Sequence, residues 1–413
     1  LRSIKDRSKE MKYIIVLGDG MAGRALGELG GRTTLEAAKT PVMDRLARVS
    51  EIGMASMVPK GMAPGSDTAN LAVLGYDPRI YYTGRSPLEA LSIGVKMEDT
   101  DVSFRCNLVT LSEEEGAYKD RTILDHSADE ISSADAAVLL EALKEGILRD
   151  GYRLYAGTSY RHLLLWERGQ VMALTPPHDI LGKRIGEYLP SDAVLREMME
   201  KSYEILERHP LNEERRRNGQ RPANAAWFWG AGKRPELTSF KERTGQKGVM
   251  ISAVDLLKGI AVGAGMDIIR VEGANGGLHT NYSGKANAAV SALTEGGYDF
   301  AYIHVEAPDE MGHQGKIEEK IQAIEAIDEK VLGTVIGGLR DAGEEFRLLL
   351  LPDHPTPIEV RTHTADPVPY LLYDSTKEEP GERIYCEKTA AGTGREWKDG
   401  FRLIGHLLQE ELC

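Results

Sequence analysis

Short apolar runs that alternate with segments of helical periodicity constrain the fold of this chain more than any other feature. The apolar runs suit buried strands at residues 13–17, 54–58, 248–252, 267–271, 300–305, 346–351 and 368–372. Helical spacing is found at residues 34–49, 254–263, 285–293, 317–339 and 401–412. Strands that alternate with helices predict an α/β fold, in which a mostly parallel sheet is covered by helices on both faces.

The residues between 101 and 244 have a different pattern. Apolar and polar residues alternate in part, which predicts strands with one covered face over residues 102–109, 152–155 and 162–166. Helices are expected over residues 133–149 and 191–208, and the polar stretch 212–224 is expected to be a loop or linker.

A chain of 413 residues is too long for one compact core, so two domains are expected. The change of pattern predicts where they divide. We expect a core domain split into residues 1–100 and 245–413, with an α+β cap domain inserted over residues 101–244.

The balance of charge argues against a general nucleic-acid binder. The chain has 64 Asp and Glu against 51 Lys and Arg, a net charge of −13, and no basic stripe. A small anionic substrate is compatible with this net charge, because a local pocket of Arg and Lys can be positive although the chain as a whole is negative. No apolar run reaches membrane-spanning length. We therefore expect neither a nucleic-acid partner nor a membrane partner.

Cysteine usage predicts a reducing compartment. Cys106, Cys386 and Cys413 form no CxxC pair, so a disulfide framework is not expected. Residues 1–12 are charged and lack the apolar core of a signal peptide. Both features predict a cytoplasmic location, and the sequence leaves the oligomeric state open.

A hydroxyl lies at an apparent helix start in the stretch Ala63-Pro64-Gly65-Ser66-Asp67-Thr68-Ala69-Asn70-Leu71. A serine at such an entry lies near free backbone N–H groups and the positive end of the helix dipole, which favour a phosphate or an oxyanion. The plainer interpretation is that Ser66 is an N-cap, since serine is a preferred cap residue. The acids and histidines elsewhere in the chain favour the first interpretation.

Candidate metal ligands follow the predicted strands. Asp19 comes after the first strand, and Asp353-His354 come after the run 346–351, between two prolines. Asp309 and His313 are four residues apart, so one helical turn would aim both at one point. A further candidate at the same edge is His363.

Each pattern alone has a plainer interpretation, because an isolated DxxxH is usually a surface pair and an isolated Asp-His is usually a turn. The joint pattern is more specific, since charges at a buried strand end need a partner or a cation. Seven candidate ligands, counting Ser66, suit two ions better than one. Carboxylate and imidazole suit Mn²⁺, Zn²⁺ or similar divalent ions, and paired metals are a known device for phosphoryl chemistry.

Several strings together resemble the alkaline-phosphatase superfamily and, within it, the archaeal-type cofactor-independent phosphoglycerate mutases. They are G-D-G-M-A-G from Gly18, A-P-G-S-D-T-A-N-L-A from Ala63, A-P-D-E-M-G-H-Q-G from Ala307, P-D-H-P-T-P from Pro352 and T-H-T-A-D-P-V-P from Thr362. Segments of the middle region, such as Tyr160-Arg161-His162 and Thr175-Pro176-Pro177-His178-Asp179, match this group and not phosphatases in general. The resemblance implies an alkaline-phosphatase-like core with an inserted cap.

The resemblance also implies roles for the candidate residues. Ser66 would be the nucleophile and become phosphoserine while phosphoryl passes between 3-phosphoglycerate and 2-phosphoglycerate, without a bisphosphoglycerate cofactor. One divalent ion would be held by Asp309, His313 and His363. The other would be held by Asp19, Ser66, Asp353 and His354.

A mutase must also hold glycerate, exclude water and move protons, which a closing cap domain can do. Asp179 is the candidate general acid/base; the alternative is a loop aspartate that caps the residues after it. The family match suggests that His178 contacts substrate, although the longer bacterial mutases carry Arg-Asp at this pair. Arginine suits bidentate anion recognition, which favours Arg161. The remaining substrate-binding candidates are Lys285 and Asp67, with Asn70 as a further residue that could orient the loop; the alternative for Asp67 is that it caps the helix.

Two other functions stay open on the same residues. The first is a metal-dependent phosphatase, phosphodiesterase or phosphopentomutase, which the products formed from 3-phosphoglycerate would reveal. The second is a binding or scaffold protein that keeps the fold without catalysis. The full set of ligands argues against the second, since a retired enzyme would be expected to lose some of them.

Overall fold

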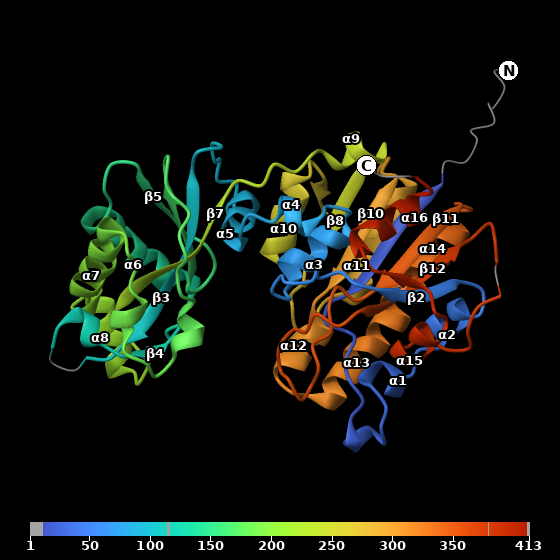
Figure 1. Cartoon of the computed structure of the whole chain (residues 1–413), viewed down its shortest axis with the longest axis horizontal. Coiled ribbons are helices and arrows are strands. Elements are labelled where there is room, and N and C mark those ends of the chain that lie inside the picture. The colour runs from blue at the N-terminus through green and yellow to red at the C-terminus, as the bar shows by residue number, and fades with distance from the viewer. Residues whose placement is uncertain (1–10, 114–115, 379, 411–413) are drawn as a thin grey trace. The chain divides into compact units, whose positions relative to one another are not determined.

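The computed structural model describes residues 11–113, 116–378 and 380–410, and the statements below concern these residues. The chain divides into two compact units (Figure 1). The core unit runs up to residue 82 and resumes at residue 236, and the middle unit spans residues 83–235. Both predicted boundaries, 100/101 and 244/245, fall later in the chain than these.

An eight-stranded sheet forms the centre of the core unit, in the order β13-β2-β12-β11-β1-β10-β8-β9. Its strands are β1 (Lys12–Gly18), β2 (Glu51–Ala55), β8 (Gly248–Ile251), β9 (Asp267–Ile268), β10 (Phe300–Val305), β11 (Phe346–Leu351), β12 (Val368–Asp374) and β13 (Glu396–Trp397). Only β12 runs against its neighbours, β11 and β2, and the other pairings are parallel. The predicted α/β fold with a mostly parallel sheet is confirmed.

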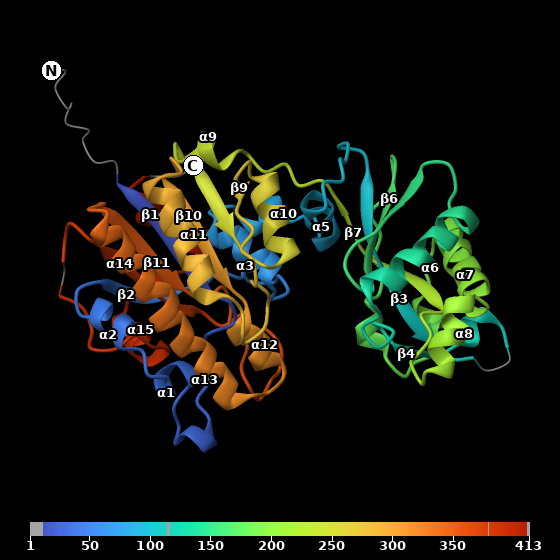
Figure 2. The same ribbon diagram turned by 180° about the vertical axis from the view of Figure 1, so that it is seen from behind.

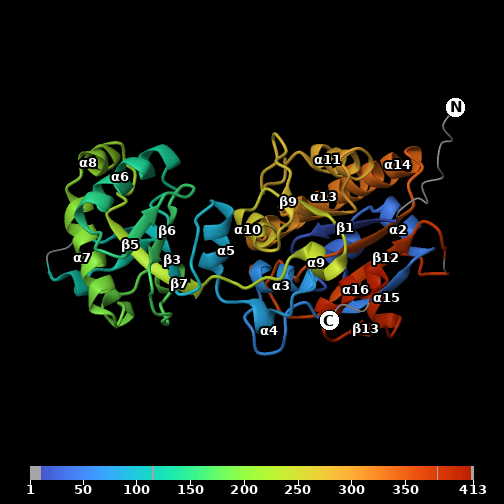
Figure 3. The same ribbon diagram turned by 90° about the horizontal axis from the view of Figure 1, so that it is seen from above.

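Helices cover both faces of this sheet, as the view in Figure 3 shows. On one side lie α11 (Tyr282–Thr294), α13 (Ile317–Ala326) and α14 (Gly333–Asp341). The other side carries α3 (Ser66–Val73), α9 (Phe240–Thr244) and α16 (Leu403–Leu408). The remaining helices of the core unit are α1 (Thr34–Ala37), α2 (Pro41–Ala47), α4 (Pro78–Tyr81), α10 (Asp255–Gly263), α12 (Ala307–His313) and α15 (Glu387–Gly392).

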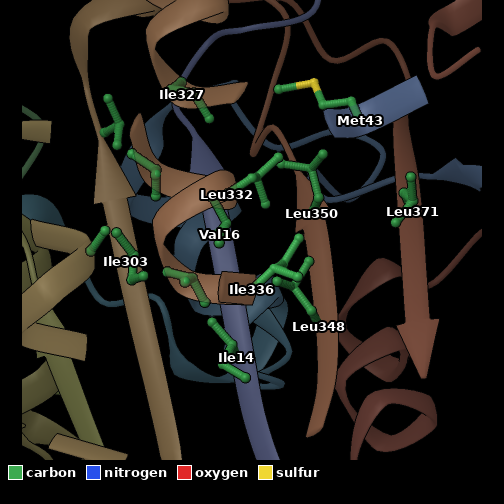
Figure 4. Packing of buried hydrophobic residues seen from close by; sticks show 14 of the residues in the cluster. Ile14, Val16, Met43, Ile303, Ile327, Leu332, Ile336, Leu348, Leu350 and Leu371 are labelled. Carbon is green, nitrogen blue, oxygen red and sulfur yellow. The ribbon is translucent and has the colours of Figure 1, made fainter. Parts of the chain in front are cut away.

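The main apolar core lies between the sheet and the first group of helices. Alternate residues of β1, Ile14 and Val16, point into this core and are fully buried. They pack with the strand residues Ile303, Leu348 and Leu350 and the helix residues Ile327, Leu332 and Ile336 (Figure 4). Because both faces of the sheet are covered, the strands read as continuous apolar runs in the sequence.

The predicted helix over residues 34–49 is wrong, because the structure has two short helices there. The first, α1, has a capping box between Thr33 and Glu36. Pro41 then opens α2, since proline lacks the N–H that would continue a helix and disfavours helical geometry at the residue before it. The strand predicted over residues 54–58 is displaced, because β2 begins at Glu51 and ends at Ala55.

Two predicted helices differ in detail from the observed ones. The predicted range 317–339 contains α13, a π-helical segment at Ile327–Leu332 and the first part of α14. The predicted range 401–412 contains the end of a short 3₁₀ turn, Gly400–Arg402, followed by α16. Gln409 has a φ of 60° and ends this helix, while residues 411 and 412 lie outside the described part of the chain.

The middle unit contains a second, antiparallel sheet. Its strands are β3 (Val102–Leu111), β4 (Ile123–Asp125), β5 (Tyr152–Tyr155), β6 (Arg161–Trp166) and β7 (Ala225–Lys233). Its helices are α5 (Arg85–Ser92), α6 (Ser133–Gly146), α7 (Ala193–Glu207) and α8 (Pro210–Arg217). Helices α6 and α7 lie beside this sheet (Figure 2), and their apolar residues share one buried cluster with it.

Sequence reasoning missed β4 and β7, and the predicted loop 212–224 is wrong at its start. Residues 212–217 belong to α8, whose first turn has Pro210 and whose N-cap, His209, accepts a hydrogen bond from Leu211 N at 3.2 Å. The basic residues Arg215, Arg216 and Arg217 fall in its last turn, where the helix dipole favours cations.

Asp328 caps a helix far from it in the sequence. Helix α2 has no side-chain cap of its own, and the carboxylate of buried Asp328 accepts hydrogen bonds from Val42 N at 3.1 Å and Met43 N at 2.7 Å. We expect Asp328→Ala to lower the free energy of unfolding by about 2–3 kcal/mol, because the buried N–H of Met43 and the partly buried N–H of Val42 lose their acceptor. Urea unfolding measures this, with exposed Glu329→Ala as the control; equal midpoints for the two variants would contradict the assignment.

Candidate active site

The carboxyl ends of three neighbouring parallel strands bring the candidate ligands to one edge of the core sheet. β1 lies between β10 and β11, and its Leu17 is in register with both His304 and Leu351. Asp19 follows β1, and Asp353 and His354 follow β11. In open α/β sheets this is the edge at which ligands bind.

Asp309, His313 and His363 converge at this edge. Helix α12, which follows β10, carries Asp309 and His313 one turn apart, with His313 Nε2 at 3.2 Å from Asp309 Oδ2. His363 comes from the loop after β11, and its Nε2 lies 3.0 Å from His313 Nε2 and 3.5 Å from Asp309 Oδ1. The predicted convergence of the helical pair with the distant histidine is therefore observed.

Asp19, Ser66, Asp353 and His354 converge beside them. His354 Nε2 lies 3.2 Å from Ser66 Oγ, 3.4 Å from Asp353 Oδ2 and 3.6 Å from Asp19 Oδ1. Asp353 and His354 are fully buried and Asp19 is 2% exposed, whereas Ser66 is half-buried. The hydroxyl therefore stands at the more open side of a buried, charged cluster.

Ser66 is the first residue of α3 and not its N-cap. The cap position is Gly65, whose backbone is extended and which makes no side-chain cap bond, while the side chain of Asp67 accepts a hydrogen bond from Thr68 N in the first turn. The plainer interpretation of Ser66 is therefore wrong. Its hydroxyl is directed to His354 and is not used to stabilise the helix.

The charges of this cluster do not balance by themselves. Burial raises the pKa of Asp19 well above its usual value, and the nearby carboxylates of Asp353 and Asp309 raise it further. Burial acts in the same direction on Asp309, but hydrogen bonds with His313 and His363 outweigh it and hold its pKa well below the usual value. The hydrogen bond with Asp309 in turn raises the pKa of His313 to about 9.

The residues present fit divalent cations. Ligand atoms of Asp309, His354 and His363 lie within 4.8 Å of one another, and so do those of Asp19, Asp353 and His354. Among the described residues, Asp19 Oδ1 is buried and has no hydrogen-bond partner. A buried carboxylate oxygen beside other carboxylates needs a positive partner, and carboxylate and imidazole are the ligands that Mn²⁺ and Zn²⁺ accept.

A glycine permits the close approach of the ligand loops. Gly20 follows Asp19, has a φ of 59°, and donates its N–H to Asp353 Oδ1 at 3.2 Å. A Cβ at this position would lie 2.5 Å from Asp309 Oδ1 and 2.5 Å from Thr356 Oγ1. Both the backbone conformation and the space therefore require glycine.

Three residues that support these ligands were not identified from the sequence. His304 Nε2 lies 2.9 Å from Asp19 Oδ2, and its Nδ1 lies 3.2 Å from Ser252 Oγ, so this histidine orients Asp19. Thr356 donates to Asp309. Buried Lys320 donates to the carbonyls of Ala22 at 3.2 Å and Thr356 at 2.7 Å, which ties the two ligand loops together. His304 is the penultimate residue of an apolar strand, which was an available signal in the sequence, whereas Lys320 offered no such signal.

Two further predicted substrate contacts have partners inside the core unit. Lys285 is fully buried, its Nζ donates to His304 O at 2.9 Å, and burial lowers its pKa to about 8. Asp67 accepts a hydrogen bond from Tyr82 at 2.6 Å and another from Thr68 N at 2.9 Å. Contact of either side chain with substrate stays a prediction.

The other predicted substrate residues lie in the middle unit. His178 and Asp179 belong to a short 3₁₀ turn, Pro177–Ile180, and His178 Nε2 is 3.6 Å from Asp179 Oδ1. Arg161 opens β6, is exposed, and donates to the hydroxyl of Tyr160 at 3.2 Å. The roles of these three residues also stay predictions.

Their neighbours include a buried cation that sequence reasoning missed. The guanidinium of Arg105, on β3, lies 4.3 Å from the ring centroid of Trp229 and donates to Glu89 at 2.9 Å. Burial lowers its pKa to about 10. The same Trp229 ring is 5.3 Å from the ring of His178. An arginine inside the apolar run 102–109 was the signal for this position.

Other expectations concern the thiols and the membrane. Cys106 is buried, and burial raises the pKa of its thiol, which does not suit a nucleophile. Within the described ranges, no helix has the length and apolar character needed to cross a membrane.

Comparisons with known proteins agree with the sequence motifs. The model of a family described as 2,3-bisphosphoglycerate-independent phosphoglycerate mutase matches residues 47–212. The chain is 48% identical to a probable enzyme of this description from Geobacter sulfurreducens, over 96% of this chain and all of that one. A second relative of this description, from Methanothrix thermoacetophila, is 49% identical over 96% of this chain and all of its own length.

Solved structures give the same result. A Pyrococcus horikoshii protein matches with a TM-score of 0.80 and 30% identity, over 97% of this chain and 98% of that one. A cofactor-independent phosphoglycerate mutase from Thermoplasma acidophilum matches with a TM-score of 0.61 and 26% identity, over 96% of this chain and 99% of that one. The chain belongs to the family of 2,3-bisphosphoglycerate-independent phosphoglycerate mutases.

Proposed function

We propose that the chain interconverts 3-phosphoglycerate and 2-phosphoglycerate by passing the phosphoryl group through Ser66, as a step of glycolysis and gluconeogenesis. Family membership supports the reaction. The observation that carries the role of Ser66 is the position of its Oγ, which lies 3.2 Å from His354 Nε2 among buried carboxylates and imidazoles. An alcohol that is not used as a helix cap in such surroundings suits a nucleophile.

The ligand set supports two divalent ions, with Mn²⁺ proposed and Zn²⁺, Co²⁺ or Mg²⁺ as alternatives. Asp309, His313 and His363 would hold one ion. Asp19, Ser66, Asp353 and His354 would hold the other. When bound, such ions supply positive charge for phosphate oxygens and lower the pKa of an alcohol. His304, Thr356 and Lys320 orient the ligands through the hydrogen bonds described above.

The residues themselves account for the transfer. Ser66 Oγ gives up its proton and attacks phosphorus, the bond from phosphorus to the C3 oxygen of the substrate breaks, and that oxygen takes up a proton. The C2 hydroxyl then gives up a proton and attacks the phosphoserine, which breaks the bond to Oγ, and Oγ takes up a proton again. The amino end of α3 favours the anionic group throughout, because its first N–H groups have no carbonyl partner within the helix, although Thr68 N donates to the side chain of Asp67.

Proton transfer and glycerate binding are assigned to the middle unit, which we propose acts as a cap. Asp179 is the proposed acid and base for the two glycerate oxygens, with His178 beside it. Arg161 suits the anionic groups of the substrate, and the buried Arg105 adds positive charge to the same unit. Cytoplasmic location remains a prediction from the sequence.

The direct test measures two products in the same samples. The protein is incubated with 3-phosphoglycerate and Mn²⁺ in the absence of bisphosphoglycerate, and 2-phosphoglycerate and free phosphate are both assayed. Formation of 2-phosphoglycerate with little free phosphate supports the mutase. Stable release of phosphate without isomer would favour a phosphatase on the same core, and neither product would favour a non-catalytic protein.

Asp179→Asn tests the proton-transfer role. We expect kcat to fall by about 10²–10⁴-fold, because the amide cannot exchange the proton of either glycerate oxygen. Exposed Asp150→Asn, in the same unit, is the control and should leave kcat unchanged. If Asp179→Asn keeps the activity of this control, Asp179 is only a loop residue.

A further inference from the structure

A buried amide joins the helix that carries Ser66 to the loop that carries Asp353. Asn70 is fully buried on α3, four residues after Ser66, so one helical turn brings its side chain beside the backbone of Ser66. Its Nδ2 donates to Ser66 O at 2.8 Å and to Asp353 Oδ2 at 2.8 Å. One side chain therefore holds both the proposed nucleophile and a proposed metal ligand.

The chemistry of the neighbours fixes the orientation of this amide. The carbonyl of Ser66 and the carboxylate of Asp353 can only accept hydrogen bonds, so Asn70 must turn its nitrogen toward them. Its oxygen then faces β10, where the hydroxyl of Tyr302 donates to it at 2.5 Å. Tyr302 is also fully buried, so water does not easily replace this donor.

The hydroxyl of Tyr302 stays a donor at neutral pH. Burial raises the pKa of Tyr302 well above its usual value, and the carboxylates of Asp353 and Asp19 raise it further. If the hydroxyl were removed, Asn70 Oδ1 would lose the donor that the structure gives it. The side-chain amide of Asn70 could regain a donor for its oxygen only by moving, and such a movement would disturb its hydrogen bonds to Ser66 and Asp353.

We infer that Tyr302 is a positioning residue for phosphoryl transfer: its hydroxyl fixes the amide of Asn70, which holds Ser66 and Asp353 in one arrangement. The inference rests on the proposed function of Ser66. Tyr302 touches neither Ser66 nor Asp353 through any hydrogen bond of the described structure, so it acts through Asn70. Transfer needs the attacking oxygen to be held close to its line of approach, and small misplacement of such a group is costly.

Tyr302→Phe removes one oxygen and keeps the packing of the ring. We expect kcat to fall about 10- to 100-fold with KM unchanged, because the geometry of attack is lost while the substrate-binding residues remain. The Mn²⁺ concentration for half-maximal activity should rise, since Asp353 is less firmly held. Tyr385→Phe is the matched control, because Tyr385 is also buried in the core unit and donates to Pro369 O at 2.7 Å. It should lower the unfolding midpoint as much as Tyr302→Phe does and leave kcat unchanged.

A double-mutant cycle separates action through Asn70 from a general effect. In an Asn70→Ala background, Tyr302→Phe should change kcat by less than about twofold, since the group that it positions is already absent. The inference is overturned if Tyr302→Phe has the same kcat as the Tyr385→Phe control. It is also overturned if the reductions of kcat caused by Tyr302→Phe and by Asn70→Ala multiply in the double variant. Ser66→Ala in the same assay keeps the two questions apart, because an active Ser66→Ala protein would overturn the proposed function itself.

Discussion

Ser66→Ala is expected to abolish the interconversion of phosphoglycerates, with kcat reduced by about 10⁴-fold or more. The variant lacks the only atom of this side chain that can accept the phosphoryl group, and removal of a nucleophile is among the largest losses that single substitutions cause. The fold should be unaffected, because the hydroxyl does not cap α3 and Ser66 is not fully buried. The measurement is formation of 2-phosphoglycerate, together with the unfolding midpoint of the same preparation.

The control for this experiment is Ser283→Ala. Ser283 is an exposed serine in the first turn of α11, in the same unit, and should keep full activity. After incubation with substrate and rapid denaturation, the unaltered protein should carry phosphate on Ser66, and Ser66→Ala should carry none. Full activity of the Ser66→Ala protein would contradict the phosphoserine mechanism.

Removal of divalent metal is the second large expected effect. Treatment with a chelator should eliminate activity and lower the unfolding midpoint, and added Mn²⁺ should restore both. Without a cation, Asp19, Asp309 and Asp353 lie close together with a buried oxygen of Asp19 unpartnered. An ion at about 1,000 times its dissociation constant would stabilise the folded state by about 4 kcal/mol.

Asp19→Asn is the variant that connects this effect to the proposed site. It relieves the repulsion between carboxylates, so the metal-free variant should unfold at a higher temperature than the metal-free parent protein, while Mn²⁺ should raise its midpoint less. Glu329→Ala, remote from these ligands in sequence and exposed, should respond to Mn²⁺ as the parent protein does. Identical unfolding midpoints of the parent protein with chelator and with saturating Mn²⁺ would show that no ion binds at this cluster.

The parts of the fold that were predictable are those in which local pattern and tertiary packing agree. β10, β11 and β5 have the predicted limits, because each is a compact apolar or alternating run. The ligand positions followed from the same pattern, since charged residues at the ends of buried strands need partners. Asp309 and His363 are 54 positions apart in the sequence. They come close together because Asp309 follows β10, His363 follows β11, and both strands flank β1.

The parts that were missed depend on contacts between distant segments. The break at Pro41 is stabilised by Asp328, which no local window contains. Lys320 occupies a helix in which lysine is ordinarily exposed, and only the assembled loops explain its burial. The partnership of Tyr302 with Asn70 is of the same kind, because a tyrosine in an apolar strand is usually a packing residue.

The central position of β1 has a consequence for biosynthesis. This strand is made long before its neighbours in the sheet, which are residues 300–305 and 346–351. At 5–20 residues per second, it waits roughly 15–60 s on the ribosome for the first of them. In incomplete chains the apolar side chains of β1 therefore lack their partners from β10 and β11, which favours chaperone binding, and the proposed metal ligands that follow those two strands are not yet made.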